Sequence, residues 1–302
     1  MPDPNGTGPP HSQGPWVGRP SSGDRLGSIE NRLRSSGLSR ALLRPAFRAY
    51  RYILGHAAIR GIPITVNGID RFRFHPDCLG LGLEDYEHDA YRTFVERLGP
   101  GDHFIDVGAH VGVYTLAAAR RVGPDGRVLA LEPVPPSLER LRAHVRWNGM
   151  DDVVETIAAA ASDVDGVATL HFHGGGSTAA FLPQAVHTAD PSALRVTTLT
   201  LDGLSRERRV RPRVVKIDVE GAELHVLRGM GRILDADRPS VFCEVHPVWL
   251  GAMGGSLVDL EDLLRRHGYS VHDAADGSST ALGPRGQYVF EPVEAAFLKE
   301  PT

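Results

Sequence analysis

The chain has 302 residues, of which 41% are hydrophobic and 23% charged, and its net charge is −4. This composition is typical of a globular protein with a proper core, and the slightly acidic balance excludes a general attraction to nucleic acid or acidic lipid. Its two cysteines form no CxxC pair and no run of eighteen apolar residues is present. Both observations predict a cytoplasmic protein without stable membrane insertion.

The first 83 residues are expected to precede the main domain. Residues 1–27 are rich in Pro, Gly and Ser and lack the order of a signal peptide, so we expect a disordered tail. Residues 28–83 predict a helical and β-hairpin extension, with Asn67-Gly68 as the hairpin turn. The helical part is rich in arginine, which is interpreted either as a solvated face or as a contact with an anionic substrate or a membrane surface.

Residues 84–302 predict a single α/β domain. A helix is expected within residues 83–98, after which apolar strands alternate with helical segments, as in a parallel sheet covered on both faces. Two late segments without a convincing helix between them are expected to pair as an antiparallel edge. The expected strands are 103–108, 127–133, 153–160, 213–218, 240–245 and, at the edge, 269–274 (YSVHDA) and 294–300 (EAAFLKE). The expected helices between them are 113–123, 136–149, 221–235 and 256–268.

A glycine turn follows the first of these strands, in FIDVGAHVG at residues 104–112. Gly108 allows a sharp backbone turn, and Gly112 allows the next helix to pack close to the sheet. The fingerprint G-x-G-x-x-G of dinucleotide-binding proteins is absent. S-adenosylmethionine instead needs an acid for its amino-acid end and another for its ribose. Asp106 and Glu132, at the ends of the first two strands, supply both.

The segments FIDVGAHVGVYTLAAARRVGPDGRVLALEP, AAAASDVDG and VVKIDVEGAELHVLRGM closely resemble the FkbM family of S-adenosylmethionine-dependent methyltransferases. The resemblance implies a Rossmann-like, seven-stranded class I methyltransferase sheet, mostly parallel with an antiparallel last strand, and usually O-methylation. It assigns Asp106, Gly108, His110 and Gly112 to the methionine end of the cofactor, Glu132 to the ribose and Ser162 to the adenine. His110 departs from the family, where Asn is frequent.

Side chains that could act on the methyl acceptor follow the later strands. Asp218 ends one strand, and Glu244 and His246 end the next. His246 is predicted to be the general base, because imidazole titrates near neutrality, with Glu244 orienting it. Glu220 and Glu223 can be explained as acids of a first helical turn. No metal is assigned, although Asp218, Glu244 and His246 could instead hold a divalent cation.

The leading hypothesis is therefore a methyltransferase (EC 2.1.1.-) acting on a hydroxyl of a sugar or secondary metabolite, with a small-molecule acceptor and no nucleic acid as partner. The alternatives are an NAD-dependent oxidoreductase and a catalytically inactive, cofactor-binding interaction module. The absent third glycine argues against the oxidoreductase, and the intact acids argue against the inactive module. Three glycines at residues 174–176 are expected to form a mobile loop over the substrate. The oligomeric state cannot be predicted from these patterns.

Overall fold

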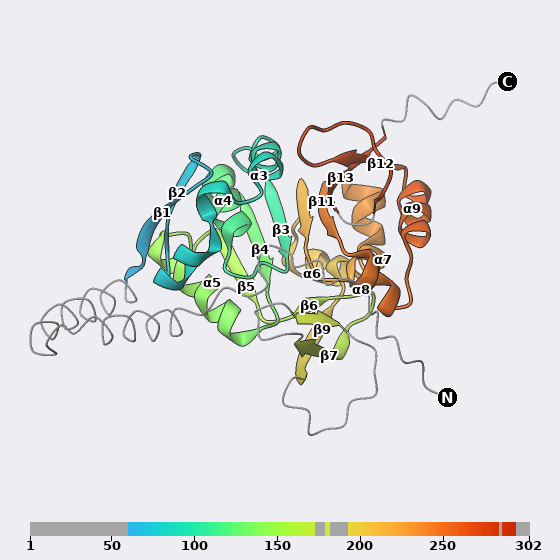
Figure 1. Cartoon of the computed structure of the whole chain (residues 1–302), viewed down its shortest axis with the longest axis horizontal. Helices are drawn as coiled ribbons and strands as arrows, with labels where there is room; N and C mark the ends of the chain where they lie inside the picture. Colours follow the sequence, from blue (N-terminus) through green and yellow to red (C-terminus); the bar gives the residue numbers. More distant parts are fainter. Residues whose placement is uncertain (1–59, 173–178, 182–192, 284–285, 294–302) are drawn as a thin grey trace, which may run out of the picture.

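A seven-stranded sheet forms the centre of the protein in the computed structural model, which describes residues 60–172, 179–181, 193–283 and 286–293 (Figure 1). Its first five strands along the chain run parallel, and the last strand, β13, runs antiparallel to both of its neighbours. In spatial order the strands are β12 (Tyr269–Asp273), β13 (Gly286–Pro292), β11 (Ser240–Val245), β10 (Val214–Ile217), β3 (His103–Val107), β4 (Arg127–Leu131) and β5 (Val154–Ile157). The mostly parallel sheet and its antiparallel last strand confirm the predicted fold.

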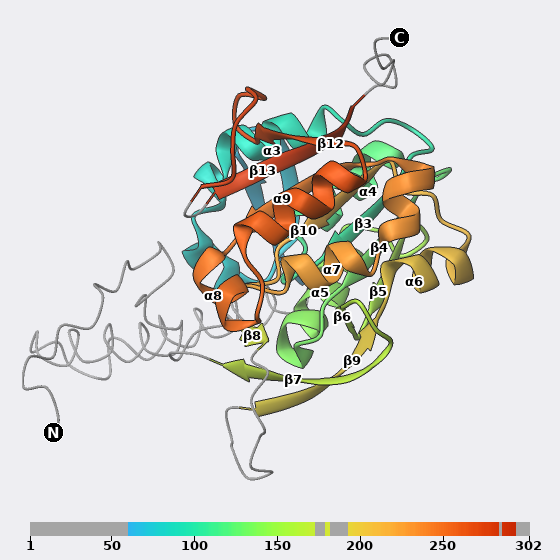
Figure 2. The same ribbon diagram turned by 90° about the vertical axis from the view of Figure 1, so that its right-hand side faces the viewer.

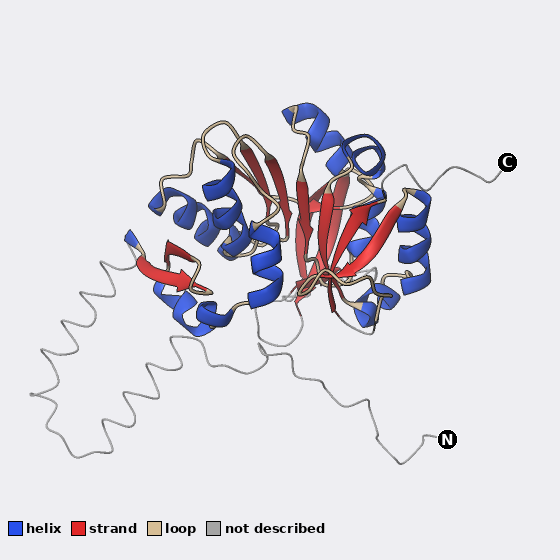
Figure 3. Ribbon diagram, turned by 90° about the horizontal axis from the view of Figure 1, so that it is seen from above, coloured by secondary structure: helices blue, strands red, loops and turns tan. Residues whose placement is uncertain are grey.

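Helices cover both faces of the sheet, because the strands are apolar on both sides (Figure 3). Neighbouring residues of a strand point to opposite faces, so Phe104 packs with the helices of one face and Ile105 with those of the other. The first face carries α3 (His88–Val95), α4 (Val113–Val122) and α5 (Pro135–Trp147). The second carries α6 (Leu201–Arg208), α7 (Glu223–Arg228), α8 (Pro247–Ala252) and α9 (Leu257–Arg266).

The strand order reverses between β3 and β10. From β3 the chain proceeds to β4 and β5 on one side, whereas β10 and β11 lie on the other side. Ligands of open α/β sheets bind at the carboxyl ends of the strands at such a reversal. The fold therefore brings the end of β3 and the end of β10 together as the expected place for a site.

The predicted hairpin is present as β1 (Ile62–Val66) and β2 (Asp70–Phe74). Val66 pairs with Asp70, so the loop has three residues, and Asn67 and Gly68 have positive φ angles of +53° and +69°, as the central residues of a type I′ turn require. The inward side chains of both strands pack into the same core as α3, α4 and α5. Two short 3-10 helices, Pro76–Leu81 and Leu83–Asp85, then lead to α3, so the predicted helix begins only at His88.

Two expected elements are divided in the structure, and a third lies at another position, as described in the next paragraph. The strand predicted at 153–160 divides, because β5 ends at Ile157 and Ala160–Ala161 (β6) joins another sheet. That second sheet has the order β6-β9-β7-β8, with β7 at Gly166–Phe172, β8 at Ala179–Phe181 and β9 at Ala193–Leu199. It lies beyond one end of the main sheet in Figure 2. The helix predicted at 221–235 is interrupted after α7, and a π-helical turn follows at Ile233–Asp237.

The final antiparallel strand was expected in EAAFLKE, but it lies earlier, at Gly286–Pro292. It inserts between β11 and β12 instead of forming the sheet edge. EAAFLKE itself falls outside the described residues, as do the predicted tail, the arginine-rich helical stretch and the three-glycine loop. Within the described part, no helix has the length and apolar character needed to cross a membrane.

Candidate active site

The turn after β3 has the backbone that its glycines predict. Gly108 has a φ of +77°, and a Cβ atom added there would lie 1.9 Å from the carbonyl oxygen of Asp218. Gly112 has a φ of +91°, and its Cβ would lie 2.5 Å from Leu141 of α5. Only glycine permits both the turn and these close approaches. His110, with a φ of +49°, occupies a left-handed conformation that Asn and His adopt more readily than most residues.

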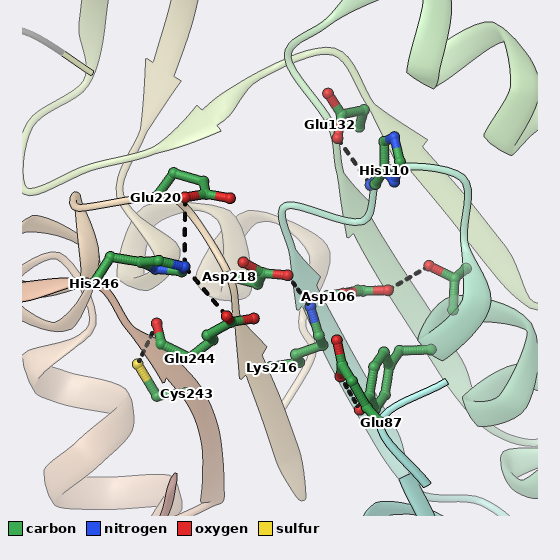
Figure 4. A network of polar contacts seen from close by, with 12 residues as sticks. Glu87, Asp106, His110, Glu132, Lys216, Asp218, Glu220, Cys243, Glu244 and His246 are labelled. Atoms are coloured by element: carbon green, nitrogen blue, oxygen red, sulfur yellow. Dashed lines mark hydrogen bonds and ion pairs between the residues drawn. The ribbon is translucent and has the colours of Figure 1, made fainter. Parts of the chain in front are cut away.

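Glu132 connects this turn to the end of β4 (Figure 4). Its Oε2 accepts a hydrogen bond from the backbone N–H of His110 and its Oε1 accepts one from that of Val134, both at 2.8 Å. The carboxylate is buried, and burial raises its pKa to about 7, although the two backbone donors oppose this rise. The acid predicted for the ribose therefore also fixes the glycine turn.

Asp106 lies at the end of β3 with 1% of its surface exposed. Its Oδ2 accepts a hydrogen bond from the hydroxyl of Thr115 on α4, whereas its buried Oδ1 has no hydrogen-bond partner. Burial raises the pKa of this carboxyl, and the nearby Lys216 opposes that effect. An unsatisfied buried carboxylate oxygen is costly unless a ligand completes it. Asp106 therefore fits the positively charged amino-acid end of S-adenosylmethionine.

Ser162 follows β6 in the second sheet. Its backbone N–H bonds to the carbonyl of Leu199, and its hydroxyl donates to Asp163 at 3.2 Å. These contacts do not join it to Asp106, Glu132 or the glycine turn. The structure therefore brings the first two acids and the turn together and leaves the adenine assignment of Ser162 as a prediction.

The three residues predicted to act on the acceptor lie together beyond β10 and β11. Asp218 continues the alternation of β10 with Val214 and Lys216, and Glu244 lies on the side of Phe242 in β11. His246 follows the end of β11 and precedes α8. One potential ligand atom from each of Asp218, Glu244 and His246 lies within 4.8 Å of the other two. The ends of the adjacent strands β10 and β11 thus bring these three side chains into one cluster.

The imidazole of His246 is surrounded by carboxylates and is 5% exposed. Its Nδ1 lies 2.9 Å from Oε1 of Glu223, and its Nε2 lies 3.3 Å from Glu244 and 3.4 Å from Glu220 (Figure 4). Burial disfavours the charged imidazole, but the carboxylates outweigh burial and raise the pKa to about 10. This rise departs from the expectation that the histidine titrates near neutrality.

Lys216 is a buried cation that the sequence reasoning missed. It is the register partner of Asp106 across β3 and β10, and its Nζ lies 3.1 Å from Oδ2 of Asp218 and 4.9 Å from the ring centre of Tyr114. Burial alone would lower its pKa, but Asp218, Asp106 and Glu87 raise it. Its position two residues before Asp218, on the same face of the strand, was the available signal.

Glu87 was also missed, whereas Glu223 was a candidate whose role the sequence left open. Glu87 precedes α3, and its Oε2 accepts a hydrogen bond of 2.6 Å from the hydroxyl of Tyr114. Glu223 was explained as an acid of a first helical turn, and its Oε1 does accept a hydrogen bond from the backbone N–H of Gly221. The same oxygen also contacts His246, which only the packing of α7 against β11 reveals.

Comparison with known proteins agrees with this geometry. The family model described as "Methyltransferase FkbM domain" matches residues 106–271, more than half of the chain and all of the strand ends described above. The methyltransferase FkbM of Streptomyces tacrolimicus, named for 31-O-demethyl-FK506, is 30% identical over 226 residues, covering 63% of this chain and 81% of that protein.

Two further similarities cover less of the compared proteins. The AMB antimetabolite synthetase AmbE of Pseudomonas aeruginosa is 28% identical over 267 residues, which is 73% of this chain and only 12% of AmbE. A methyltransferase FkbM crystal structure from Methylobacillus flagellatus KT aligns with 71% of this chain and 54% of its own, at 15% identity and a TM-score of 0.43.

The family match covers both the glycine turn and the strand ends that carry the acidic cluster. It excludes the oxidoreductase and makes S-adenosylmethionine the methyl donor. The chain belongs to the FkbM family of S-adenosylmethionine-dependent methyltransferases.

Proposed function

We propose that this methyltransferase transfers its methyl group to a hydroxyl of a small molecule, such as a sugar or a secondary metabolite. The observation that carries the proposal is the cluster of Asp218, Glu244 and His246 beside the turn that ends β3. The relative from Streptomyces tacrolimicus supports it, because its name specifies an oxygen of a small molecule.

In this proposal the cofactor lies along the ends of β3 and β4. Asp106, Gly108, His110 and Gly112 hold its methionine end, Glu132 its ribose and Ser162 its adenine. The free Oδ1 of Asp106 and the second lone pairs of the Glu132 oxygens supply the acceptors that an ammonium and ribose hydroxyls require. The bound sulfonium supplies an activated methyl group, so the protein has mainly to align the acceptor oxygen with it.

The acceptor hydroxyl is then placed against Asp218, Glu244 and His246. Nε2 of His246 is proposed to receive the hydroxyl proton, and Glu223 on Nδ1 keeps the ring oriented. For this role Nε2 must be deprotonated when the acceptor binds. The positive charge of the bound sulfonium near the carboxylates lowers the pKa of the imidazole and so favours the deprotonated state. His246, Asp218 and Glu244 are therefore the proposed catalytic residues.

A combined binding and turnover experiment tests the function. The full chain would be titrated with S-adenosylhomocysteine by calorimetry and incubated with S-adenosylmethionine and a panel of sugars and hydroxylated natural products. We expect binding of the homocysteine nucleoside, loss of affinity in Asp106→Ala, and a methyl ether as product. His246→Ala should retain the affinity and lose turnover.

The outcome that contradicts the proposal is equally specific. Methylation of an amine, thiol or carbon atom by a protein that binds the cofactor would exclude hydroxyl transfer. Full turnover of a verified acceptor by His246→Ala would exclude His246 as the base.

A further inference from the structure

We propose that Asp218, Glu244 and His246 form a binding site for a divalent cation at the ends of β10 and β11. The candidate ligand atoms, one from each side chain, all lie within 4.8 Å of one another. Ligands on opposite sides of one cation are about 4.2–4.4 Å apart, given metal–ligand distances near 2.1–2.2 Å. Adjacent ligands are about 3.0–3.5 Å apart, so side-chain rotations that move the ligand atoms by up to about 1 Å would complete the site.

The imidazole of His246 provides an independent indication. It is 95% removed from solvent, since its exposed fraction is 5%, and its Nε2 has no hydrogen-bond partner. This atom points between the carboxylates of Glu220 and Glu244 in Figure 4, at 3.4 and 3.3 Å. A buried nitrogen aimed at carboxylates without a hydrogen bond is the arrangement that a cation between them would satisfy.

Glu223 completes this arrangement from the other side of the ring. Its fully buried carboxylate can only accept, so Nδ1 of His246 carries the hydrogen in their 2.9 Å contact. In the neutral ring this leaves the lone pair on Nε2, directed toward the cluster. Histidines that bind metals usually donate their other N–H to a carboxylate in this way, which fixes the tautomer and the ring orientation.

The charges around the cluster also favour a cation. Four carboxylates lie close to one another here. Those of Glu220, Glu223 and Glu244 contact His246. That of Asp218 contacts Lys216 and belongs to the same cluster. Lys216 pairs with Oδ2 of Asp218, and thus offsets one of these negative charges. Negative charges gathered at one place attract a divalent cation.

The donor set selects the kind of cation. Two carboxylate oxygens and one imidazole nitrogen suit Mn²⁺, because carboxylates favour Mg²⁺ and Mn²⁺ while imidazole favours transition metals. A three-ligand site leaves coordination positions open. If the proposed hydroxyl acceptor is correct, its oxygen would bind there and its pKa would fall, so that its proton would pass to solvent water; Nε2 of His246, as a ligand of the cation, would then not be the base. This last step rests on the proposed function, whereas cation binding does not.

Manganese binding to the full chain tests the inference. The protein would be dialysed against a chelator and titrated with Mn²⁺ while free Mn²⁺ is measured by electron paramagnetic resonance. We expect one Mn²⁺ per chain, with affinity at least about tenfold weaker in His246→Gln, Asp218→Asn and Glu244→Gln. Glu223→Gln, which disturbs only the orientation of the ring, should weaken binding by about 10–100-fold. The matched control is His267→Gln, which breaks the 2.6 Å imidazole–carboxylate pair with Asp235 at the end of α9 and should bind Mn²⁺ like the wild type.

Calorimetry with S-adenosylhomocysteine on every variant separates folding from metal binding. A protein that binds this nucleoside but takes up no Mn²⁺, or binds Mn²⁺ equally in all variants, overturns the cation site and leaves the methyltransferase function intact. A protein that binds Mn²⁺ at these residues but methylates no hydroxyl supports the cation site and contradicts the proposed acceptor.

Discussion

Nδ1 of His246 lies 2.9 Å from Oε1 of Glu223, a carboxylate with no exposed surface. The pair joins the first turn of α7 to the end of β11, and the same oxygen accepts the backbone N–H of Gly221. Replacement by Gln keeps the shape of the side chain but removes its charge. We expect Glu223→Gln to lower turnover by about 10–100-fold without changing the affinity for S-adenosylhomocysteine.

Turnover and calorimetric affinity measured on the same preparation check this prediction, and Glu223→Asp should restore part of the turnover. An equal loss of both quantities in Glu223→Gln would show that Glu223 merely stabilises the fold.

Gly108 should tolerate no side chain. Its φ is +77°, and an added Cβ would meet the carbonyl oxygen of Asp218, a backbone atom that cannot rotate away. We expect Gly108→Ala to lower the free energy of unfolding by about 4 kcal/mol or more and to abolish cofactor binding. Gly149→Ala is the matched control, because Gly149 has a φ of +66° but no atom within 4 Å of its Cβ position.

Denaturant titration of both alanine variants measures the difference. The control should lose only about 1–2 kcal/mol for its left-handed backbone. Similar losses in the two variants would mean that the contact with Asp218 has no energetic consequence.

Lys216 should contribute to stability through its partners. Its side chain is 10% exposed and neutralises part of the charge of Asp218 and Asp106. Lys216→Met would leave these acids without their buried cation, and we expect a loss of about 3–5 kcal/mol in the free energy of unfolding. The double variant Lys216→Met/Asp218→Asn should recover part of this loss. Strict additivity of the two single changes in thermal or chemical unfolding would rule out the coupling.

His144 should make the protein less stable in acid. The ring is completely buried, where its Nδ1 contacts the carbonyl of Val111 at 2.7 Å and its Nε2 accepts the backbone N–H of His75 at 2.8 Å. Burial lowers the pKa of His144 to about 4, although the carbonyl of Val111 opposes this effect. Because the unfolded chain binds the proton more readily, stability from this group is present above pH 6.5 and is lost as the pH falls toward 4.

Between pH 7 and pH 5 this loss should be about 2 kcal/mol. Unfolding in denaturant at both pH values, compared with His144→Gln, isolates the contribution from that of other titrating groups. If the variant and the wild type lost the same free energy on acidification, His144 would not be the responsible group.

Much of the site could be predicted because it depends on periodicities of two residues. Asp106 and Glu132 end adjacent parallel strands, and Glu244 and His246 are two residues apart at the end of the next strand but one, so these side chains meet at one edge of the sheet. The glycine turn could be predicted because Gly108 and Gly112 follow a buried strand. These features require only local sequence.

The missing parts depend on contacts between distant segments. Lys216 lies in an apolar run that predicts a strand, and nothing in that run indicates that the lysine has acidic partners. Glu87 lies before α3 and contacts Tyr114 of α4, which is distant in the sequence. Glu223 has a sufficient local explanation at the start of α7, which conceals its contact with His246. In the second sheet, β6 has two residues and β8 three, too short for a periodic signal, whereas β7 and β9 have seven each and were missed although their length allowed one.

The contact of Gly108 with the carbonyl of Asp218 joins the two halves of the site through main-chain atoms, and the N–H of Asp218 bonds to the carbonyl of Val107 at 3.1 Å. The backbone therefore fixes the separation between the end of β3, where the cofactor is proposed to bind, and Asp218, which is proposed to face the acceptor. Changes in the side chains around the proposed acceptor would leave this main-chain separation unchanged.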